Sequence, residues 1–254
     1  MKIEVLGCHG SETREARTVG FLIDEEILLE AGTVSSVLSV ERQRRIHSVI
    51  ISHLHLDHIK ELPFLVDNRM GEGTGSITVY GIAEVLDGLR AHLFNDIIWP
   101  DFTGIVNGDR PPVCLCSMVP GQETGIGDFV ITPAVVNHRV PSVGMLIKRE
   151  DRGFLYTGDT APTGEIWTLA NRTPHLGAVL IEVSFPDGLE EVARASAHMT
   201  PSMVASELDK LERRDIPIYV FHMKPKYKET IVRELGGLLG NRVQVLEEGH
   251  VIEL

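Results

Sequence analysis

The chain has 254 residues, of which 43% are hydrophobic and 24% are charged, and its formal net charge is −12. This length suits one large α/β domain or two small ones. A large nucleic acid is not an expected partner, because phosphate binding needs a basic face and the chain has no basic run of that kind. A membrane is not expected either, since no apolar stretch approaches the roughly 18 residues of a spanning helix.

Short apolar runs bounded by Gly, Pro, Asp and Asn predict strands along the chain. In chain order the predicted strands are Lys2–Leu6, Val19–Ile23, Ile27–Glu30, Ser48–Ser52, Ile77–Tyr80, Phe129–Val135, Val143–Ile147, Phe154–Thr157, Ala178–Val183, Ile218–Val220 and Val243–Leu246. The predicted helices are Ser35–Arg44, Ile59–Asp67, Ala83–Leu93, Gly164–Ala170, Leu189–Ala197, Ser202–Arg213 and Lys228–Leu238. The first half is rich in strands, and later strands alternate with helices, which favours sheets covered by helices. The glycine-rich segment Gly71–Ser76 matches no phosphate-binding loop and is interpreted as a turn.

The three cysteines are an odd, low number that gives no disulfide framework. Cys114 and Cys116 form a C-x-C pair, and a single pair of this kind is better interpreted as alternate residues of a strand than as a metal site. The residues Met1–Leu6 resemble a strand rather than a signal peptide, because they contain no long apolar segment. We therefore expect a reducing, cytoplasmic location.

The strongest signal in the sequence is the motif His53-Leu54-His55-Leu56-Asp57-His58, which directly follows the apolar strand Val49–Ser52. Its histidines and its aspartate are ligand types that zinc prefers, and a catalytic zinc site leaves one position open for water. One short loop cannot supply all the ligands of two metal ions. Further ligands must therefore come from other parts of the chain.

Three candidates for these ligands each follow an apolar strand, namely His138, Asp159 and His222. Taken alone, each would more often be an ordinary loop residue. A ligand placed after a strand, repeated along the chain, is however what a site at one edge of a sheet requires. Together with the motif, these residues predict a metal centre at such an edge.

The motif and the residues at the strand ends resemble those of the metallo-β-lactamase superfamily, and the resemblance covers nearly the whole chain. It implies an α/β fold, a four-layer αββα sandwich formed by a single domain of residues 1–254. It also implies two divalent metal ions at one edge of the sheets, expected to be Zn²⁺, although Mn²⁺ or Fe could use the same ligands. By this resemblance the first ion is bound by His53, His55 and His138. The second ion is bound by Asp57, His58 and His222, and Asp159 bridges the two ions.

The fold and the metals do not decide the substrate, because members of this superfamily hydrolyse lactams, thioesters and phosphodiesters. His198 lies between Asp159 and His222 in a His-x-Thr segment. Phosphodiesterase members of the superfamily carry a similar segment, in which the histidine serves the leaving group. The alternative interpretation of His198 is an ordinary residue at the start of a helix.

The chain is most similar to the class II cyclic-nucleotide phosphodiesterases, whose H-x-H-L-D-H signature matches the motif, including Leu56. Looser similarity is found in Leu6–Cys8, Ala31–Thr33, His92–Asn95, Ile98–Pro100, Thr157–Thr160 and Glu182–Phe185. Two positions differ from that family. Glu30 stands where an aspartate usually precedes Ala-Gly-Thr, which is expected to shift a hydrogen bond to a metal-binding histidine. Arg139 stands where a small residue is common, and it places a cation beside the metals.

The resemblance implies a phosphodiesterase that converts 3′,5′-cyclic nucleotides, cAMP or cGMP, to 5′-monophosphates by attack of a hydroxide that bridges the metals. Asp57 and His198 are the candidate catalytic residues, and His198 would protonate the leaving 3′-oxygen. The candidate contacts for the base are the aromatic rings of Trp99, Phe102 and Phe185. The candidate contacts for the phosphate are the cations Arg139 and Lys224. The long loop around Trp99 is a candidate lid. Simple core packing is an equal alternative for Trp99, and a solvated side chain is the alternative for Lys224.

Two other kinds of function stay open. The chain could act on another phosphodiester, as a ribonuclease Z-like nuclease or on a different small molecule, although its acidic charge and the lack of a basic arm disfavour tRNA. It could also be a metal-binding protein without enzymatic activity, which the complete ligand set and His198 disfavour. The expected substrate is thus a small anionic phosphodiester. A homodimer is common in the superfamily and is considered for this chain as well.

Overall fold

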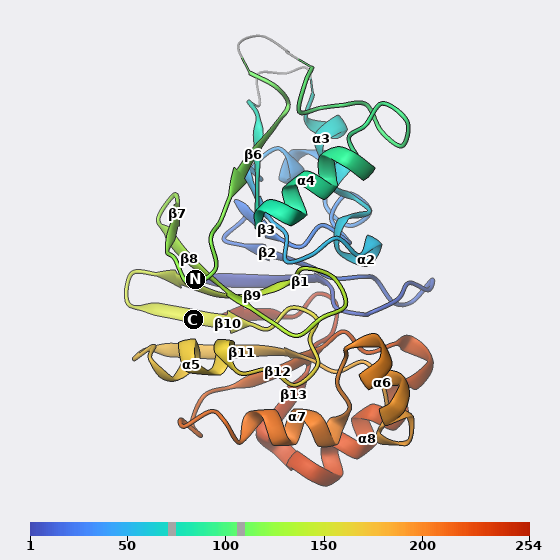
Figure 1. The fold of residues 1–254 in the computed structure, drawn as a ribbon, viewed down its shortest axis with the longest axis vertical. Coiled ribbons are helices and arrows are strands. Elements are labelled where there is room, and N and C mark those ends of the chain that lie inside the picture. Colours follow the sequence, from blue (N-terminus) through green and yellow to red (C-terminus); the bar gives the residue numbers. More distant parts are fainter. Residues whose placement is uncertain (71–74, 106–109) are drawn as a thin grey trace.

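The structure is a computed structural model that describes residues 1–70, 75–105 and 110–254. The turn predicted at Gly71–Ser76 falls mostly on residues 71–74, which lie outside the described residues. Within the described residues, the strands form two sheets stacked face to face (Figure 1). The two termini lie close together, where the amino group of Met1 donates to the carbonyl of Leu254 at 2.9 Å.

The first sheet is mixed, and most of its strands come from the first half of the chain. They are β1 (Lys2–Gly7), β2 (Gly20–Ile23), β3 (Ile27–Leu29), β4 (Ser48–Ile50), β5 (Ile77–Gly81), β6 (Val113–Ser117) and β14 (Val251–Glu253). Their order across the sheet is β14-β1-β2-β3-β4-β5-β6. Strands β3 to β6 are parallel, so their carboxyl ends meet at one edge. The motif that begins at His53 follows β4 at this edge.

The second sheet holds the strands that precede the other predicted ligands. They are β7 (Thr124–Ile126), β8 (Phe129–Val135), β9 (Val143–Arg149), β10 (Arg152–Tyr156), β11 (Leu176–Glu182), β12 (Ile218–Phe221) and β13 (Val243–Val245). Their order is β13-β12-β11-β10-β9-β8-β7. Strands β10 to β13 are parallel, and β8 has the same direction because both β8 and β10 pair antiparallel with β9. The carboxyl ends of β8, β10, β11 and β12 therefore share an edge.

Helices lie outside both sheets and in the loops that join their strands. Among the described residues the α-helices are α1 (Val40–Gln43), α2 (Leu56–Ile59), α3 (Leu62–Arg69), α4 (Ala83–His92), α5 (Glu165–Asn171), α6 (Glu190–Ser196), α7 (Pro201–Leu208) and α8 (Lys228–Leu239). Short 3₁₀ turns occur at Asp187–Leu189, Pro225–Tyr227 and Gly240–Arg242. Figure 1 shows α3 and α4 outside the first sheet and α5, α7 and α8 outside the second. This arrangement confirms the predicted αββα sandwich, whereas the assignment of the whole chain to one domain stays a prediction.

The two sheets are joined by a cluster of three aromatic rings. Phe21 of β2 makes edge contacts with Tyr156 of β10 and Phe221 of β12, each with a centroid distance of 5.8 Å. The rings of Tyr156 and Phe221 stack at 5.1 Å. Each such pair contributes roughly 0.5–1.5 kcal/mol beyond the burial of its area. The cluster fixes the ends of β10 and β12, which Asp159 and His222 follow.

Several predicted elements differ from the structure for local reasons. The helix predicted over Ser35–Arg44 is only α1, because the backbone amides of Val34 and Ser36 donate to the Glu61 carboxylate instead of entering a helix. The helix predicted over Ile59–Asp67 is divided into α2 and α3. Pro63 stands in the first turn of α3, where its missing N–H is not needed.

Other differences concern strands. Cys114 and Cys116 lie in β6, which confirms their interpretation as strand residues. The strands β7 and β14, of 3 residues each, were not predicted. Among the described residues, the structure has no helix that is both long enough and apolar enough to cross a membrane.

Candidate metal centre

The predicted ligands meet at the carboxyl edge of the two sheets and form two groups that share Asp159. The first group is His53, His55, His138 and Asp159, and the second is Asp57, His58, Asp159 and His222. Within each group, the atoms that could bind a metal lie within 4.8 Å of one another. The structure therefore brings together residues from the ends of β4, β8, β10 and β12, as the sequence predicts.

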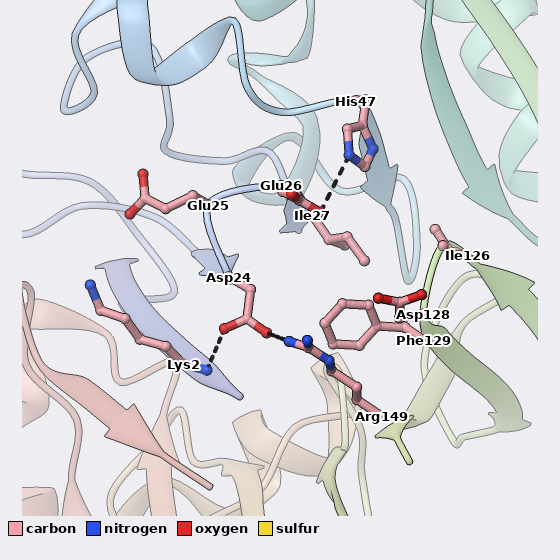
Figure 2. A pocket seen from close by; sticks show the side chains of 11 residues that line it. Lys2, Asp24, Glu25, Glu26, Ile27, His47, Ile126, Asp128, Phe129 and Arg149 are labelled. Atoms are coloured by element: carbon pink, nitrogen blue, oxygen red, sulfur yellow. Dashed lines mark hydrogen bonds and ion pairs between the residues drawn. The ribbon is translucent and has the colours of Figure 1, made fainter.

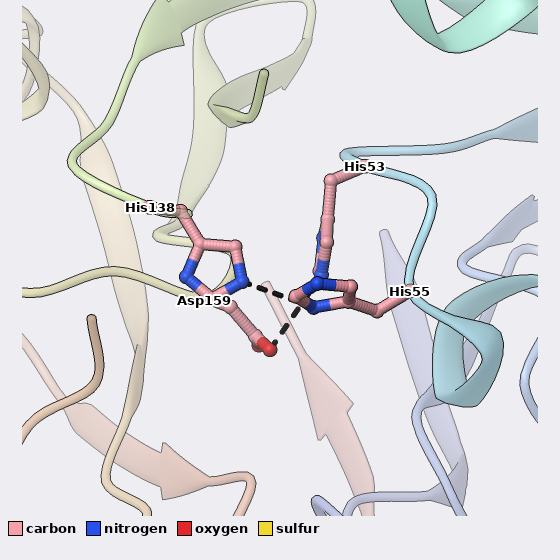
Figure 3. A group of neighbouring side chains, drawn as sticks. All are labelled: His53, His55, His138 and Asp159. Atoms are coloured by element: carbon pink, nitrogen blue, oxygen red, sulfur yellow. Dashed lines mark hydrogen bonds and ion pairs between the residues drawn. The ribbon is translucent and has the colours of Figure 1, made fainter. Parts of the chain in front are cut away.

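The first group converges on a small volume between the rings (Figure 3). Nε2 of His138 lies 3.1 Å from Nδ1 of His55. Nε2 of His53 lies 3.7 Å from Oδ2 of Asp159. Donor atoms that bind one zinc ion at about 2.0–2.1 Å in a tetrahedron are roughly 3.3 Å apart. The spacing of the first group fits such an ion.

The second group has similar spacing around the same carboxylate. Nε2 of His222 lies 3.1 Å from Oδ2 of Asp159 and 3.2 Å from Oδ2 of Asp57. Nε2 of His58 lies 3.4 Å from Oδ2 of Asp159. Asp159 is thus placed between the two groups, as a bridging ligand would be.

Several of these buried atoms have no hydrogen-bond partner among the described residues. They are Nε2 of His53, both ring nitrogens of His58 and Oδ1 of Asp159. A buried polar atom without a partner costs about 1–3 kcal/mol, so such atoms are rare in folded proteins. Metal ions at the two groups would satisfy the nitrogens that face the centre and the carboxylate oxygen. The donor set and these orphaned atoms therefore fit two divalent ions.

Electrostatics keeps the carboxylates of the centre charged. Burial by itself raises the pKa of Asp57, but the hydrogen bond from His222 and the charge of His58 outweigh burial and hold that pKa below its usual range. Burial also raises the pKa of Asp159, and the charges of His222 and His58 lower it well below its usual value. Burial lowers the pKa of His53 well below its usual value, so that this ring is neutral. Charged carboxylates and neutral imidazoles are the forms that bind metal ions.

The ring nitrogens that face away from the centre lie next to fixed oxygens. The pairs are Nδ1 of His53 with Oγ of Ser52 at 2.9 Å, Nδ1 of His138 with the carbonyl of Ala197 at 3.0 Å, and Nδ1 of His222 with Oγ of Ser184 at 2.8 Å. Such outer contacts fix the tautomer and orientation of a ligand ring. Each of these rings therefore presents Nε2 to the centre.

Glu30, which is longer by one methylene than the aspartate usual in the similar family, contacts His58 on the side away from the centre. Its carboxylate is fully buried, accepts from the backbone N–H of Ser52 at 3.3 Å, and lies 3.4 Å from Nδ1 of His58. Burial lowers the pKa of His58, but Asp159 and Glu30 raise it more, so its net shift is well above the usual value. A carboxylate at position 30 thus reaches the metal-site histidine in this chain.

Backbone strain is concentrated around the centre. Glu30, Ala197 and His222 are non-glycine residues with φ values of 63°, 57° and 71°. A residue held in such a region costs of order 1–3 kcal/mol and persists only where the surroundings determine it. Gly10 leaves the room that His222 needs, because a Cβ atom at Gly10 would lie 2.6 Å from Cε1 of His222.

His198 lies beside the metal groups. Its ring stacks on that of His222, with a centroid distance of 5.2 Å and an interplanar angle of 23°. Nδ1 of His198 lies 2.9 Å from Oε1 of Glu182 and 3.2 Å from Oγ of Ser184. Burial lowers the pKa of His198, but Glu182 raises it more, so the net pKa is above the usual value.

Known proteins are similar to this chain in sequence. A family model described as "Beta-lactamase superfamily domain" matches residues 29–223. The chain belongs to the beta-lactamase superfamily. A "Probable 3′,5′-cyclic-nucleotide phosphodiesterase" of Yersinia pestis is 30% identical over 239 residues, covering 82% of this chain and 68% of that protein. The "3′,5′-cyclic-nucleotide phosphodiesterase 1" of Saccharomyces cerevisiae is 25% identical over 299 residues, covering 93% of this chain and 80% of that protein.

Solved structures of the superfamily show the same fold. Yeast PDE1 without ligand superposes with a TM-score of 0.84 at 21% identity, covering 100% of this chain and 99% of that structure. The short form of human tRNase Z superposes with a TM-score of 0.73 at 19% identity, covering 100% and 99% of the two chains. Yeast PDE1 and the short form of human tRNase Z thus have the same fold as this chain.

The predicted substrate contacts of this superfamily member lie in different surroundings. Phe185 is half-buried, and its ring lies 6.0 Å from that of His198. Nε of Arg139 donates to the carbonyl of Ala195 at 2.6 Å, and Nζ of Lys224 donates to the carbonyl of Gly10. Phe185 therefore has a place beside the centre, while both cations are held by backbone carbonyls.

The two aromatic residues of the long loop contact other parts of the fold. Trp99 is partly buried and makes an edge contact with Phe64 at 5.1 Å. Phe102 is 4% exposed and packs against Phe94 in the core at 6.0 Å. A ring buried in the core does not present a face to a ligand. The prediction of Phe102 as a base platform is therefore corrected, because its ring is buried in the core against Phe94.

A cavity of about 420 Å³ lies at the opposite edge, by the amino ends of β4 and β8 (Figure 2). Some of its polar groups are paired with one another. Asp24 accepts from the backbone N–H of Lys2 at 2.7 Å and from Arg149 at 2.8 Å, and Nε2 of His47 lies 3.6 Å from Glu26. Asp24 thus has hydrogen-bond donors within the protein, in contrast to the orphaned atoms of the metal groups.

Sequence reasoning did not assign roles to Glu182 and Ser184. Glu182 is the last residue of β11 and Ser184 lies two residues beyond it, and β11 pairs with β10 and β12. Their position resembles that of the predicted ligands, because polar residues at the carboxyl end of a buried strand lie at the site edge. The signal was weaker because neither residue is a histidine within a recognisable motif.

Proposed function

We propose that this chain is a dinuclear-metal phosphodiesterase that hydrolyses 3′,5′-cyclic nucleotides, cAMP or cGMP, to 5′-monophosphates. The observation that carries the proposal is the position of His198, which stacks on His222 at 5.2 Å and is held by Glu182. A proton donor beside a metal centre is what a poor alkoxide leaving group requires. The names of the Yersinia and Saccharomyces relatives support the choice of substrate.

The metal ligands follow from the two groups. We propose that one ion is held by His53, His55 and His138, the other by Asp57, His58 and His222, and that Asp159 bridges them. Zn²⁺ is the proposed metal, with Mn²⁺ or Fe as alternatives. When bound, such ions neutralise phosphate oxygens and lower the pKa of water, which makes water a nucleophile at neutral pH.

The chain's own residues would then handle protons and orientation. Glu182 lies next to Nδ1 of His198, so Nε2 of that ring is free to donate a proton to the leaving 3′-oxygen. The side chain of Asp57 is 23% exposed, whereas that of Asp159 is 1% exposed. Asp57 is therefore the proposed carboxylate that orients the attacking water. Phe185 is the proposed contact for the base, because its ring borders His198.

The proposal also includes phosphate contacts, a loop, the location and the oligomeric state. Arg139 and Lys224 are proposed to contact the phosphate after release from their carbonyl partners. A lid role for the loop around Trp99 and a cytoplasmic location stay predictions.

We also propose a homodimer, which the exposure of Ile97 (86%) and Ile98 (62%) supports. Light scattering on the purified protein measures its mass in solution, and a monomeric mass would contradict the dimer.

The experiment that tests the function is turnover by protein reconstituted with zinc or manganese. The substrates are cAMP, cGMP, bis-p-nitrophenyl phosphate and a tRNA precursor. We expect rapid conversion of at least one cyclic nucleotide to its 5′-monophosphate and no processing of the tRNA. Hydrolysis of the chromogenic diester alone would contradict the cyclic-nucleotide assignment and keep a metal-dependent phosphodiesterase. Cleavage of the tRNA would favour a ribonuclease Z-like activity instead.

A further inference from the structure

We propose that Ser184 is a positioning residue whose single hydroxyl links the metal ligand His222 to the proton donor His198. Occupation of the second metal position and orientation of the leaving-group acid would then depend on one another. The part of this inference that concerns His198 rests on the proposed function. The part that concerns His222 rests only on the metal groups.

Ser184 lies at the point where three side chains meet. It stands two residues beyond the end of β11, is fully buried, and its backbone N–H donates to the carbonyl of Met199 at 3.0 Å. Its Oγ lies 2.8 Å from Nδ1 of His222, 3.2 Å from Nδ1 of His198 and 3.1 Å from Oε2 of Glu182. The hydroxyl is thus fixed by its backbone and surrounded by groups that need a partner.

The number of protons decides how these groups pair. His222 points Nε2 at Asp57 and Asp159, at 3.2 and 3.1 Å, so this nitrogen is the one available to a metal. A neutral ring that binds metal through Nε2 carries its proton on Nδ1. Nδ1–H of His222 must therefore donate to Oγ of Ser184, and the serine keeps its own proton for another acceptor.

That second acceptor is the Glu182 carboxylate. The carbonyl of His222 lies at a similar distance from the hydroxyl, 3.2 Å, but a charged acceptor forms the stronger hydrogen bond. Glu182 also accepts from Nδ1–H of His198 at 2.9 Å and from the backbone N–H of Thr160 at 3.1 Å. The result is one directed chain in which His222 donates to Ser184, and Ser184 and His198 both donate to Glu182.

Removal of the Ser184 hydroxyl would break two hydrogen bonds of this network, one with His222 and one with Glu182. His222, whose side chain is fully buried, would lose the acceptor that fixes its tautomer, and Glu182 would lose one of the donors that hold it against His198. Loss of such an outer contact typically lowers metal affinity about 10- to 100-fold. A Ser184→Ala variant should therefore bind metal more weakly and protonate poor leaving groups less well.

Ser52 offers a matched control on the other metal group. Its Oγ lies 2.9 Å from Nδ1 of His53, which is the same kind of contact to a ligand ring. No interaction of Ser52 with His198 or Glu182 is found among the described residues. Ser52→Ala should weaken metal binding without a specific effect on the leaving group. Ser184→Thr keeps the hydroxyl and should restore what Ser184→Ala loses.

The first readout does not need substrate. Zinc affinity is measured for the full chain by competition with a chromophoric chelator, and histidine ring nitrogens are followed by ¹⁵N NMR. We expect Ser184→Ala to lower zinc affinity about 10- to 100-fold and to lose the slowly exchanging Nδ1–H signal of His222. Ser184→Thr should recover both. Wild-type zinc affinity and an unchanged His222 signal in Ser184→Ala would overturn the link to the metal ligand.

The second readout compares leaving groups at saturating zinc. Bis-p-nitrophenyl phosphate releases a stable phenolate, whereas cAMP releases an alkoxide that needs a proton. We expect Ser184→Ala to lower kcat for cAMP more than for the diester, and to add little in a His198→Ala background. Equal losses on both substrates, as expected for Ser52→Ala, would overturn the link to His198. If the parent turns over neither substrate, the proposed function fails, while the zinc and NMR comparison still decides the link to His222.

Discussion

Oε1 of Glu182 lies 2.9 Å from Nδ1 of His198, and both side chains are buried beside the metal groups. Burial alone would lower the pKa of His198, but the neighbouring carboxylate raises it above its usual value. The pair therefore keeps a proton on the imidazole and directs Nε2 away from Glu182. This geometry suits a proton donor better than a metal ligand.

His198→Ala should abolish leaving-group protonation while both metals stay bound. We expect kcat for the cyclic nucleotide to fall about 10²- to 10⁴-fold, the usual range for the loss of a general acid. Metal content, measured by atomic spectrometry after gel filtration, should equal that of the parent. A parallel loss of metal would contradict the assignment and make His198 a ligand, which its place in a group with Glu182 and His222 allows.

Asp159→Asn should affect both metal positions, whereas His55→Ala should affect one. Asp159 belongs to both ligand groups, while His55 belongs only to the first. We expect His55→Ala to retain about one tightly bound ion per chain, because its second ligand group is intact. Asp159→Asn should retain less, because it removes a charged ligand from both groups. Equilibrium dialysis against zinc measures the stoichiometry. Equal zinc content in the two variants would contradict the bridging position of Asp159.

The metal groups were predictable because their signal is local and repeated. The motif at His53 begins three residues after the end of β4, and the later ligands follow β8, β10 and β12. Parallel strands bring their carboxyl ends to one edge, so ligands after successive strands must meet once the strands pair. The positions of the ligands after the strands were therefore enough to predict which residues meet at the centre.

The rest of the site depends on packing that the sequence does not display. The contact of Ser184 with His222 can be recognised only when β11 is placed beside β12, with Glu182 in register with Phe221. The exposure of a loop aromatic is equally hidden, because Phe102 and Phe185 look alike in sequence. The Phe102 carbonyl accepts from the backbone N–H of Val113, beside β6, and the Phe102 ring is buried.

Phe185→Ala and Phe102→Ala should separate substrate binding from stability. Phe185 is half-buried beside His198, so its loss should raise KM for the cyclic nucleotide several-fold with little change in the midpoint of unfolding. Phe102 is 4% exposed, and its truncation should cost about 3–5 kcal/mol of folding free energy. Urea unfolding and steady-state kinetics measure the two effects. An unchanged KM in Phe185→Ala would remove it as the base contact.

Glu61 provides a test of pH dependence away from the metal ligands. Its Oε2 accepts from the backbone N–H of Val34 at 2.7 Å and of Ser36 at 3.1 Å. Burial raises the pKa of this carboxyl, but these amides outweigh burial and lower it below the usual value of 4.5. A lowered folded-state pKa means that the carboxylate stabilises the fold above the unfolded pKa. This contribution is lost as the pH falls through the folded-state pKa.

Glu61→Gln should therefore destabilise the chelator-treated protein by about 1–2 kcal/mol at pH 7, because a neutral acceptor replaces a charged one. The difference from the parent should hold down to about pH 5 and shrink below about pH 4.5, where the unfolded carboxyl takes up its proton. Urea unfolding at several pH values measures it. Glu41→Gln is the control, since the Glu41 side chain is 83% exposed and should show no such dependence. A difference that persists unchanged at pH 3 would mean that the loss comes from altered packing of the loop at Val34 rather than from the charge of Glu61.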